Sequence, residues 1–325
     1  MPDLQAPLTF EPIFMERIWG GRQLETLYGK HLPPGKQIGE SWEIVDRADA
    51  QSIVRDGPLA GRSLHDLWVN FRRDIFGKVR EAARFPLLVK LLDCRETLSL
   101  QVHPPAQVAD SFGGEAKTEA WFIAHAAPGA ELYLGLQNPI ARKTFEKALT
   151  SGRAAELVRR LPVKTGDTFL IPSGRMHAIG GGNLIVEVQE NSDTTYRVFD
   201  WNRVDETGRP RQLHIRQAMR CINFTDCSPA AMSVNNESLI SDDLFAIDRW
   251  QIQSQRELAP PGTFAISCCL SGELECGGSL FRAGEFFLVP ANASNRIVQN
   301  VGSTSELLRI TAPEQLNHDA PEGDF

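Results

Sequence analysis

The sequence predicts a mainly β protein made of two related β-barrels with inserted helices. Short apolar runs broken by glycine and proline recur along most of the 325 residues, a pattern typical of strands and turns. Helical spacing is confined to a few segments. Residues 166–173 (Gly-Asp-Thr-Phe-Leu-Ile-Pro-Ser) also echo residues 284–291 (Gly-Glu-Phe-Phe-Leu-Val-Pro-Ala). Each copy has a turn glycine, an acidic residue, an apolar strand and a terminating proline, so we interpret them as equivalent parts of two barrels.

The first elements alternate between strand and helix. Residues 40–45 are the clearest of several short strands in the first 60 residues. Ser63 begins a segment that ends near Gly77 and has apolar residues at helical spacing: Leu64, Leu67, Trp68, Phe71 and Ile75. Residues 85–92 are apolar except for Lys90, which suits a buried strand.

The central elements are again mostly strands. Residues 98–102 form a strand that leads into a Pro-Pro pair, where sheet pairing stops. A glycine-containing loop over 106–116 precedes an extended segment over 117–124. Asn138-Pro139 resembles a helix cap followed by a first-turn proline, and predicts a helix toward Leu161.

These elements predict two domains. Residues 1–240 form a catalytic barrel with helical insertions at about 63–84 and 139–161, and residues 241–325 form a second barrel. When the two copies are aligned without gaps, Asn295 falls opposite His177. We therefore expect a metal site in the first barrel and none in the second.

Composition limits the partners and the compartment. The formal net charge of −7 argues against nucleic acid and against an anionic membrane surface, because an acidic protein repels both. No apolar stretch approaches the roughly 20 residues that cross a bilayer, and the first residues do not resemble a signal peptide. The six cysteines form no Cys-x-x-Cys pair, which fits reduced thiols. We expect a cytoplasmic enzyme that acts on a small molecule.

Four side chains from three segments suit a metal ion. Gln101 and His103 are two residues apart on a strand and so share a face, as do Lys117 and Glu119. The spacing Gly166-x5-Pro172-x-Gly174-x2-His177 matches the second cupin motif, which ends in a metal-binding histidine; Gly181 replaces its closing asparagine. The candidate ligands are Gln101, His103, Glu119 and His177.

This mixed oxygen and nitrogen set suits Zn²⁺. Two neutral imidazoles, an amide and a carboxylate would give the occupied site a charge of about +1, which can stabilise an anionic intermediate. Each residue also has an ordinary alternative. A lone histidine is more often structural, Gln101 alone is uninformative, and Glu119 could belong to a salt bridge.

The segment after His177 carries polar residues on one face of a strand. Glu187 and Gln189 alternate with Val186 and Val188, and polar groups that face a barrel interior are candidates for function. The alternative is a solvated sheet face.

Several segments, in order, resemble the type I phosphomannose isomerases in their short bacterial form. The matching stretches are 85–90 (FPLLVK), 98–104 (LSLQVHP), 114–121 (GEAKTEAW), 172–178 (PSGRMHA) and 192–203 (SDTTYRVFDWNR), with 19–21 and 39–43 in support. The likeness covers residues 10 to about 220 well, and the remainder only as a cupin-like, jelly-roll barrel. Thr118 stands where long members usually have proline, and the long form's extra helical domain is missing.

The resemblance implies an activity and roles for particular residues. The activity is interconversion of mannose 6-phosphate and fructose 6-phosphate through an enediol, with one Zn²⁺ per chain held by Gln101, His103, Glu119 and His177. It further implies that Arg197 is the active-site arginine, that Lys117 lies beside the substrate, and that Lys90 and Ser99 are candidates for the phosphate.

The general base and two other functions stay open. Asp193, Glu187 and Lys117 are all candidates for the base. A two-barrel oxygenase would hold iron with a similar ligand set, and a sugar-phosphate sensor without catalysis could keep the same pocket.

Overall fold

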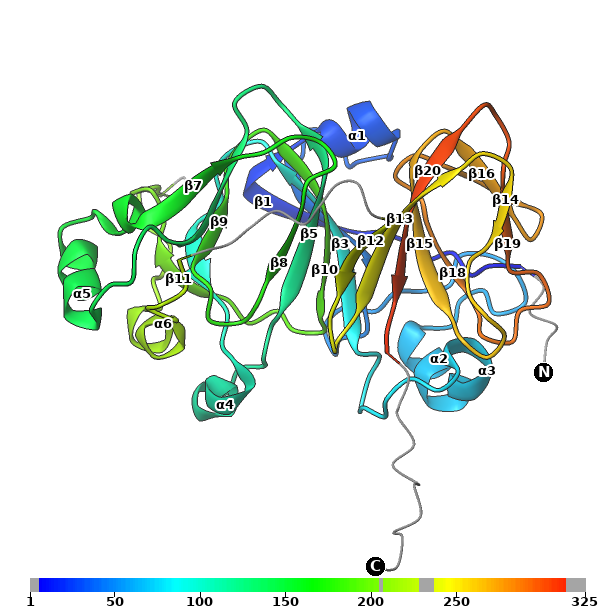
Figure 1. Ribbon diagram of the computed structural model, residues 1–325, viewed down its shortest axis with the longest axis horizontal. Coiled ribbons are helices and arrows are strands. Elements are labelled where there is room, and N and C mark those ends of the chain that lie inside the picture. The colour runs from blue at the N-terminus through cyan, green and yellow to red at the C-terminus, as the bar shows by residue number, and fades with distance from the viewer. Residues whose placement is uncertain (1–5, 205–206, 228–236, 314–325) are drawn as a thin grey trace, which may run out of the picture. The chain divides into compact units, whose positions relative to one another are not determined.

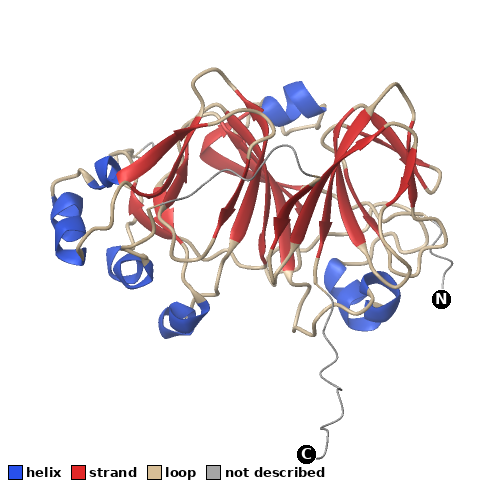
Figure 2. Cartoon of the chain, viewed as in Figure 1, coloured by secondary structure: helices blue, strands red, loops and turns tan. Residues whose placement is uncertain are grey.

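The computed structural model describes residues 6–204, 207–227 and 237–313. It confirms a mainly β fold of antiparallel sheets, in which the helices are short segments outside the strands (Figures 1 and 2). The chain divides into two compact units. The first comprises the described parts of residues 12–45 and 87–239, and the second comprises the described parts of 1–11, 46–86 and 240–325. Each unit contains two sheets.

The unit that contains the candidate ligands has a six-stranded and a five-stranded sheet. The larger sheet has the order β1 (Ile13–Gly21), β2 (Ile38–Ile44), β3 (Leu87–Cys94), β10 (Asn183–Glu190), β5 (Glu119–Ala126) and β8 (Thr168–Ile171). The smaller has the order β11 (Tyr196–Phe199), β4 (Leu100–Val102), β9 (His177–Ile179), β6 (Glu131–Leu136) and β7 (Val158–Pro162). Figure 1 shows β8, β5, β10 and β3 as neighbours in one sheet.

Short helices accompany these sheets. They are α1 (Gln23–Tyr28), α4 (Ala106–Ala109), α5 (Arg142–Thr150) and α6 (Ile215–Cys221), with 3₁₀ turns η1 (Asp110–Phe112) and η2 (Ala154–Leu157). The predicted helix over 139–161 is therefore shorter than expected. It begins after Ala141 rather than at Asn138, and residues 158–162 form β7. No described helix is long and apolar enough to span a bilayer.

The second unit contains the other barrel. One sheet has the order β12 (Ser238–Ser241), β13 (Ala246–Ile252), β20 (Ser305–Thr311), β15 (Ala265–Ser271) and β18 (Phe286–Val289). The other has the order β14 (Gln255–Glu257), β19 (Ile297–Asn300), β16 (Glu273–Cys276) and β17 (Ser279–Arg282). A buried apolar cluster that includes Trp250, Phe281 and Phe287 draws on both sheets.

The helical segment expected in the catalytic domain lies in this second unit. It forms α2 (Leu64–Asn70) and α3 (Arg72–Phe76). The ring of Phe76 lies 5.7 Å from that of Phe264, and the backbone N–H of Ala291 donates to the carbonyl of Ile75 over 2.9 Å. Gly77 has a φ of 69°, and a Cβ there would lie 2.0 Å from the carbonyl oxygen of Gly262. These contacts place the helical segment in the second unit. The sequence instead predicted this segment to lie in the domain that ends at residue 240.

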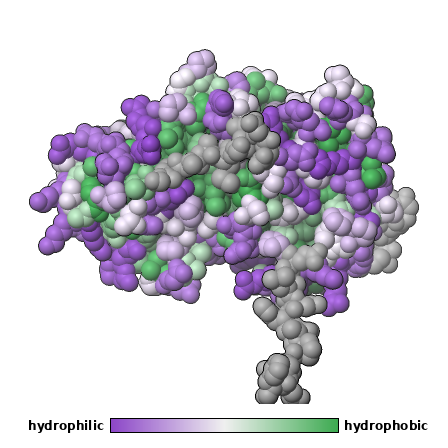
Figure 3. All heavy atoms as spheres, viewed as in Figure 1, coloured by the Kyte–Doolittle hydropathy of each residue, from purple (hydrophilic) through white to green (hydrophobic). Residues whose placement is uncertain are grey.

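Apolar side chains also fill the first unit around the candidate site. One buried cluster includes Trp19, Leu92 and Trp121, and another includes Leu100, Val102 and Tyr196. Hydrophilic residues cover much of the face in view in Figure 3. The candidate site thus lies among buried apolar side chains.

Candidate metal centre and active site

Three of the four predicted metal ligands converge inside the first unit. His103 follows β4, Glu119 begins β5 and His177 begins β9. All three side chains are buried, and one potential ligand atom from each lies within 4.8 Å of the others. β4 pairs with β9 so that Gln101 lies directly opposite His177. Strands from both sheets therefore bring together residues that are far apart in sequence.

The hydrogen bonds of the two histidines fix their protonation. Nδ1 of His103 lies 2.9 Å from the carbonyl oxygen of Thr194, and Nδ1 of His177 lies 2.9 Å from that of Arg175. A carbonyl only accepts, so each Nδ1 carries the proton and each Nε2 carries a lone pair. This is the tautomer that a metal-binding histidine adopts when a second group orients its ring.

The lone pairs of both histidines face a carboxylate. Nε2 of His103 lies 3.2 Å from Oε2 of Glu119, and Nε2 of His177 lies 3.5 Å from Oε1. Burial lowers the pKa of His103 to about 3 and also lowers the pKa of His177. Burial would raise the pKa of Glu119, but the positive charge of Lys117 holds it well below its usual range. At neutral pH, the centre therefore has two neutral imidazoles and a carboxylate.

Such an arrangement fits a cation. Nε2 of His103 and Oε1 of Glu119 are buried and accept no hydrogen bond among the described residues, while Oε2 of Glu119 lies 3.1 Å from Nζ of Lys117. Acceptor atoms that face one another without a proton are unfavourable unless a positive charge lies between them. The donor set of nitrogen and carboxylate oxygen is one that divalent transition metals prefer.

Gln101 lies beside these three residues, and its amide nitrogen rather than its amide oxygen faces His177. Its Nε2 lies 3.2 Å from Nε2 of His177, while its Oε1 accepts a long hydrogen bond of 3.4 Å from Oγ of Ser99. A half-turn of the amide would present the oxygen to the same position as the other ligands. Gln101 is thus adjacent to the centre, but the amide oxygen does not point into it.

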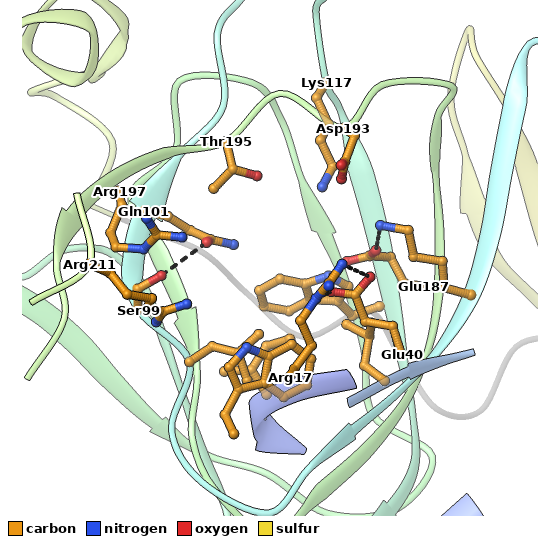
Figure 4. Close-up of a pocket in the computed structure, with 16 residues that line it drawn as sticks. Arg17, Glu40, Ser99, Gln101, Lys117, Glu187, Asp193, Thr195, Arg197 and Arg211 are labelled. Atoms are coloured by element: carbon orange, nitrogen blue, oxygen red, sulfur yellow. Dashed lines mark hydrogen bonds and ion pairs between the residues drawn. The ribbon is translucent and has the colours of Figure 1, made fainter. Parts of the chain in front are cut away.

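A pocket of about 390 Å³ adjoins the centre. Its apolar lining includes Trp19 and Trp121. Every residue that the sequence predicted for catalysis or phosphate binding also lines it, together with Gln101: Lys90, Ser99, Lys117, Glu187, Asp193 and Arg197 (Figure 4). A buried group of potential metal ligands beside a polar pocket is typical of a small-molecule active site.

Lys117 is a buried cation at this pocket. Its Nζ lies 3.1 Å from Oε2 of Glu119. Burial alone would lower the pKa of Lys117, but the carboxylates of Glu119, Glu187 and Asp193 raise it above its ordinary value. In Figure 4, Lys117 and Asp193 lie close together along the pocket. Lys117 therefore carries a positive charge at neutral pH.

Glu187 is a buried carboxyl group that favours its protonated form more than usual. Its Oε1 accepts from Nε1 of Trp121 over 3.1 Å, and its Oε2 lies 3.2 Å from Nζ of Lys90. Burial raises the pKa of Glu187, the charge of Lys90 opposes that shift, and the charge of Glu119 adds to it. A carboxyl group of this kind is suited to general acid and base chemistry.

The two residues proposed for the phosphate lie apart. Lys90 is paired with Glu187 and lies 5.0 Å from the ring centroid of Trp42. Figure 4 shows Ser99 on the other side of the pocket from Glu187, beside Arg197. The structure therefore does not bring Lys90 and Ser99 together as one anion site.

Arg197 projects from β11 into the pocket. Its Nη1 donates to the carbonyl of Gln212 over 2.9 Å, and its buried Nε has no partner among the described residues. Burial lowers the pKa of Arg197, and the charges of Arg211 and Arg203 lower it further. The group stays cationic because the pKa of a free guanidinium is far above neutral.

Sequence reasoning missed four polar residues of the pocket, namely Arg17, Glu40, Thr195 and Arg211. Arg17 and Glu40 form a two-pronged ion pair, with Nε–Oε1 and Nη2–Oε2 distances of 2.8 and 3.2 Å. Alternation with Trp19 on β1 could have indicated Arg17. Arg211 lies in an irregular segment that has no periodic signal.

Comparisons with known proteins agree with this geometry. The family model "Phosphomannose isomerase type I, catalytic domain" matches residues 8–120. The Bacillus subtilis (strain 168) protein "Probable mannose-6-phosphate isomerase GmuF" is 37% identical over 304 residues, which cover 88% of this chain and 94% of the relative. The mannose-6-phosphate isomerase ManA of the same strain is 36% identical, with coverages of 87% and 93%.

A solved structure shows the same fold. The crystal structure of the mannose 6-phosphate isomerase from Bacillus subtilis superimposes with a TM-score of 0.83 at 32% identity. The match covers 94% of this chain and 99% of that chain. Both units of the chain are therefore included in the likeness.

Proposed function

The chain belongs to the type I phosphomannose isomerases, and we propose that its conversion of mannose 6-phosphate to fructose 6-phosphate takes place beside a single Zn²⁺. The activity is that of an aldose-ketose isomerase, which moves a proton between C1 and C2 of the open-chain sugar. The enzyme must bind the phosphate, stabilise negative charge on the sugar and carry the proton.

The observation that carries the zinc proposal is the convergence of two imidazole lone pairs and one carboxylate at one point. His103, Glu119 and His177 would hold the ion with Nε2, carboxylate and Nε2 atoms. Gln101 would complete the set through its amide oxygen after the half-turn described above. When bound, such an ion acts as a Lewis acid that lowers the energy of an oxyanion on the substrate.

We assign proton transfer to Glu187. It lines the pocket, it is buried, and its raised pKa makes it a better proton acceptor than an ordinary carboxylate. Lys117 is less suited to act as a base, because its pKa is raised and its ammonium group is paired with Glu119. Lys117 would instead stabilise negative charge on the substrate, and Asp193 beside it would orient that ammonium group.

Arg197 would stabilise the enediolate that forms during proton transfer. Its guanidinium group lines the pocket, and no carboxylate among the described residues lies within ion-pair distance of it. An anionic substrate can therefore approach Arg197 without displacing a protein carboxylate. Ser99 would donate its hydroxyl to the phosphate, whereas Lys90 would act through Glu187.

Two measurements test this proposal. Protein purified without added metal should contain about one zinc per chain by elemental analysis, and a coupled assay should detect fructose 6-phosphate formed from mannose 6-phosphate. Iron in place of zinc would favour the oxygenase considered from the sequence. Tight sugar-phosphate binding without turnover in the zinc-loaded protein would favour the sensor.

A further inference from the structure

A cluster of three arginines surrounds one carboxylate next to Ser99. Asp200 is buried, and it accepts from Nε of Arg211 over 2.7 Å and from Nη2 of Arg211 over 2.5 Å. Nη2 of Arg203 also donates to Asp200, over 2.5 Å. The nearby Arg197 has no ion-pair partner among the described residues. One negative charge therefore faces three positive charges, which leaves a local excess of about two.

The two arginines bound to Asp200 differ in what else they contact. Arg211 lines the pocket, beside Arg197 and Ser99 in Figure 4. Arg203 does not line the pocket, and its Nη1 donates to the carbonyl of Thr97 over 2.7 Å. Of these two arginines, only Arg211 can therefore contact a molecule bound in the pocket.

A strained turn holds Asp200 in place. Trp201 and Asn202 both have a φ of 56°, and the N–H of Arg203 donates to the carbonyl of Asp200 over 2.9 Å. A tryptophan in this left-handed region is uncommon and strained, so the surrounding contacts must hold the turn in place. The indole of Trp201 donates to the carbonyl of Leu98 over 2.7 Å, which fixes the turn against the segment that leads into β4.

Charges elsewhere in the pocket are compensated. Arg17 is paired with Glu40, and Lys90 is paired with Glu187. A phosphate dianion placed there would meet two carboxylates and would have to disrupt both ion pairs. The arginine cluster is the part of the pocket where a dianion meets excess positive charge.

We propose that Arg211 is a specificity-determining residue that binds the phosphate of the sugar together with Ser99, and that Asp200 positions its guanidinium group. The proposal rests on the sugar-phosphate activity stated above. A guanidinium fork suits phosphate oxygens because it offers parallel N–H donors. Arg197 adds to the positive potential at the same place. The cluster would thus favour phosphorylated sugars over free sugars.

Two matched variants of the zinc-loaded enzyme test this role. Arg211→Gln and Arg203→Gln each remove one partner of Asp200, but only the first removes a guanidinium from the pocket. We expect Arg211→Gln to raise KM for mannose 6-phosphate by about 10- to 100-fold while kcat stays within about threefold. The inhibition constant of inorganic phosphate as a competitor should rise by a similar factor. Arg203→Gln should change both constants by less than about twofold.

The outcomes separate this proposal from the metal and proton-transfer assignments. Calorimetric titration with inorganic phosphate reports the anion site without turnover, so a wrong base or metal assignment does not affect it. Unchanged phosphate affinity in Arg211→Gln, or equal losses in both variants, overturns the proposal. If Arg211→Gln does not fold, Arg211→Lys replaces it, with an expected loss of phosphate affinity of about three- to tenfold. Wild-type affinity in Arg211→Lys would also overturn the proposal.

Discussion

The ammonium group of Lys90 lies 3.2 Å from Oε2 of Glu187, and both side chains are buried. Each residue lies on a central strand of the six-stranded sheet, where Glu187 of β10 is directly opposite Lys90 of β3. The register of two strands thus fixes a cation against the carboxyl group that we assign to proton transfer. Because of this pairing, we expect a substitution of Lys90 to affect proton transfer by Glu187 rather than phosphate binding.

Replacing Lys90 with glutamine should lower kcat rather than raise KM. Without the ammonium group, the pKa of Glu187 should rise further, because Lys90 is the main charge that opposes the effect of burial. The acid limb of the kcat profile should then shift to higher pH. A large rise in KM with kcat unchanged would instead indicate that Lys90 binds the phosphate.

Replacing Glu187 with glutamine should remove the proton carrier and keep the pocket shape. We expect kcat to fall by about 10²- to 10⁴-fold, the usual contribution of general acid–base catalysis. In the wild type, kcat should fall as pH drops through the raised pKa of Glu187, since only the carboxylate can accept a proton. Zinc content and thermal unfolding serve as controls. Near-normal turnover in Glu187→Gln would transfer the role to Asp193.

Replacing Arg197 with alanine should leave the fold and the zinc content intact while kcat drops by orders of magnitude. The expected loss of about 10²- to 10³-fold corresponds to removal of one charged donor to a developing oxyanion. Circular dichroism, elemental analysis and the coupled assay measure the three properties. Normal turnover in this variant would rule out a catalytic role for Arg197.

The site residues that could be predicted from sequence are those whose geometry is local. Strand alternation places Gln101 and His103 on one face, and motif spacing singles out His177. The structure brings His103, Glu119 and His177 together. Arg211 could not be predicted in this way, because its place in the pocket depends on an ion pair with Asp200 across an irregular segment.

The same distinction applies to the fold. Helical spacing correctly indicated that residues 64–76 bury one apolar face, but periodicity does not say which surface covers that face. Phe76 packs against Phe264, so the helices lie in the second unit rather than in the catalytic one. The helix predicted from Asn138 was shortened because residues 158–162 pair with β6.

Removing the metal should abolish activity and lower thermal stability. When the free concentration of an ion is about 100 times its Kd for the folded state, binding stabilises that state by about 3 kcal/mol. Dialysis against a chelator should therefore lower Tm by several degrees, and added zinc should restore both Tm and turnover. His177→Ala should lose the metal, whereas the matched variant His65→Ala should keep it. Equal zinc content in these two variants would contradict the ligand assignment.

A final prediction concerns Asp93, outside the pocket. Its carboxylate accepts the N–H groups of Gln23 and Leu24 at the start of α1, where no side chain of the helix itself provides a cap. Burial nevertheless raises the pKa of Asp93 to about 6. Its Oδ1 has no hydrogen-bond partner among the described residues. In the unfolded chain the pKa of aspartate is about 3.9.

Between these two values the folded protein binds more protons than the unfolded chain, so the contribution of Asp93 to stability falls as pH rises from about 4 to 6. Asparagine at this position keeps an acceptor for the helix and has no charge to bury. The free energy of unfolding of Asp93→Asn minus that of the wild type should therefore grow by about 1–3 kcal/mol from pH 4 to pH 7. Urea unfolding at both pH values measures it. The exposed Asp243→Asn variant controls for loss of a charge. A difference that is constant with pH for Asp93→Asn would show that folding does not raise the pKa of this carboxyl group.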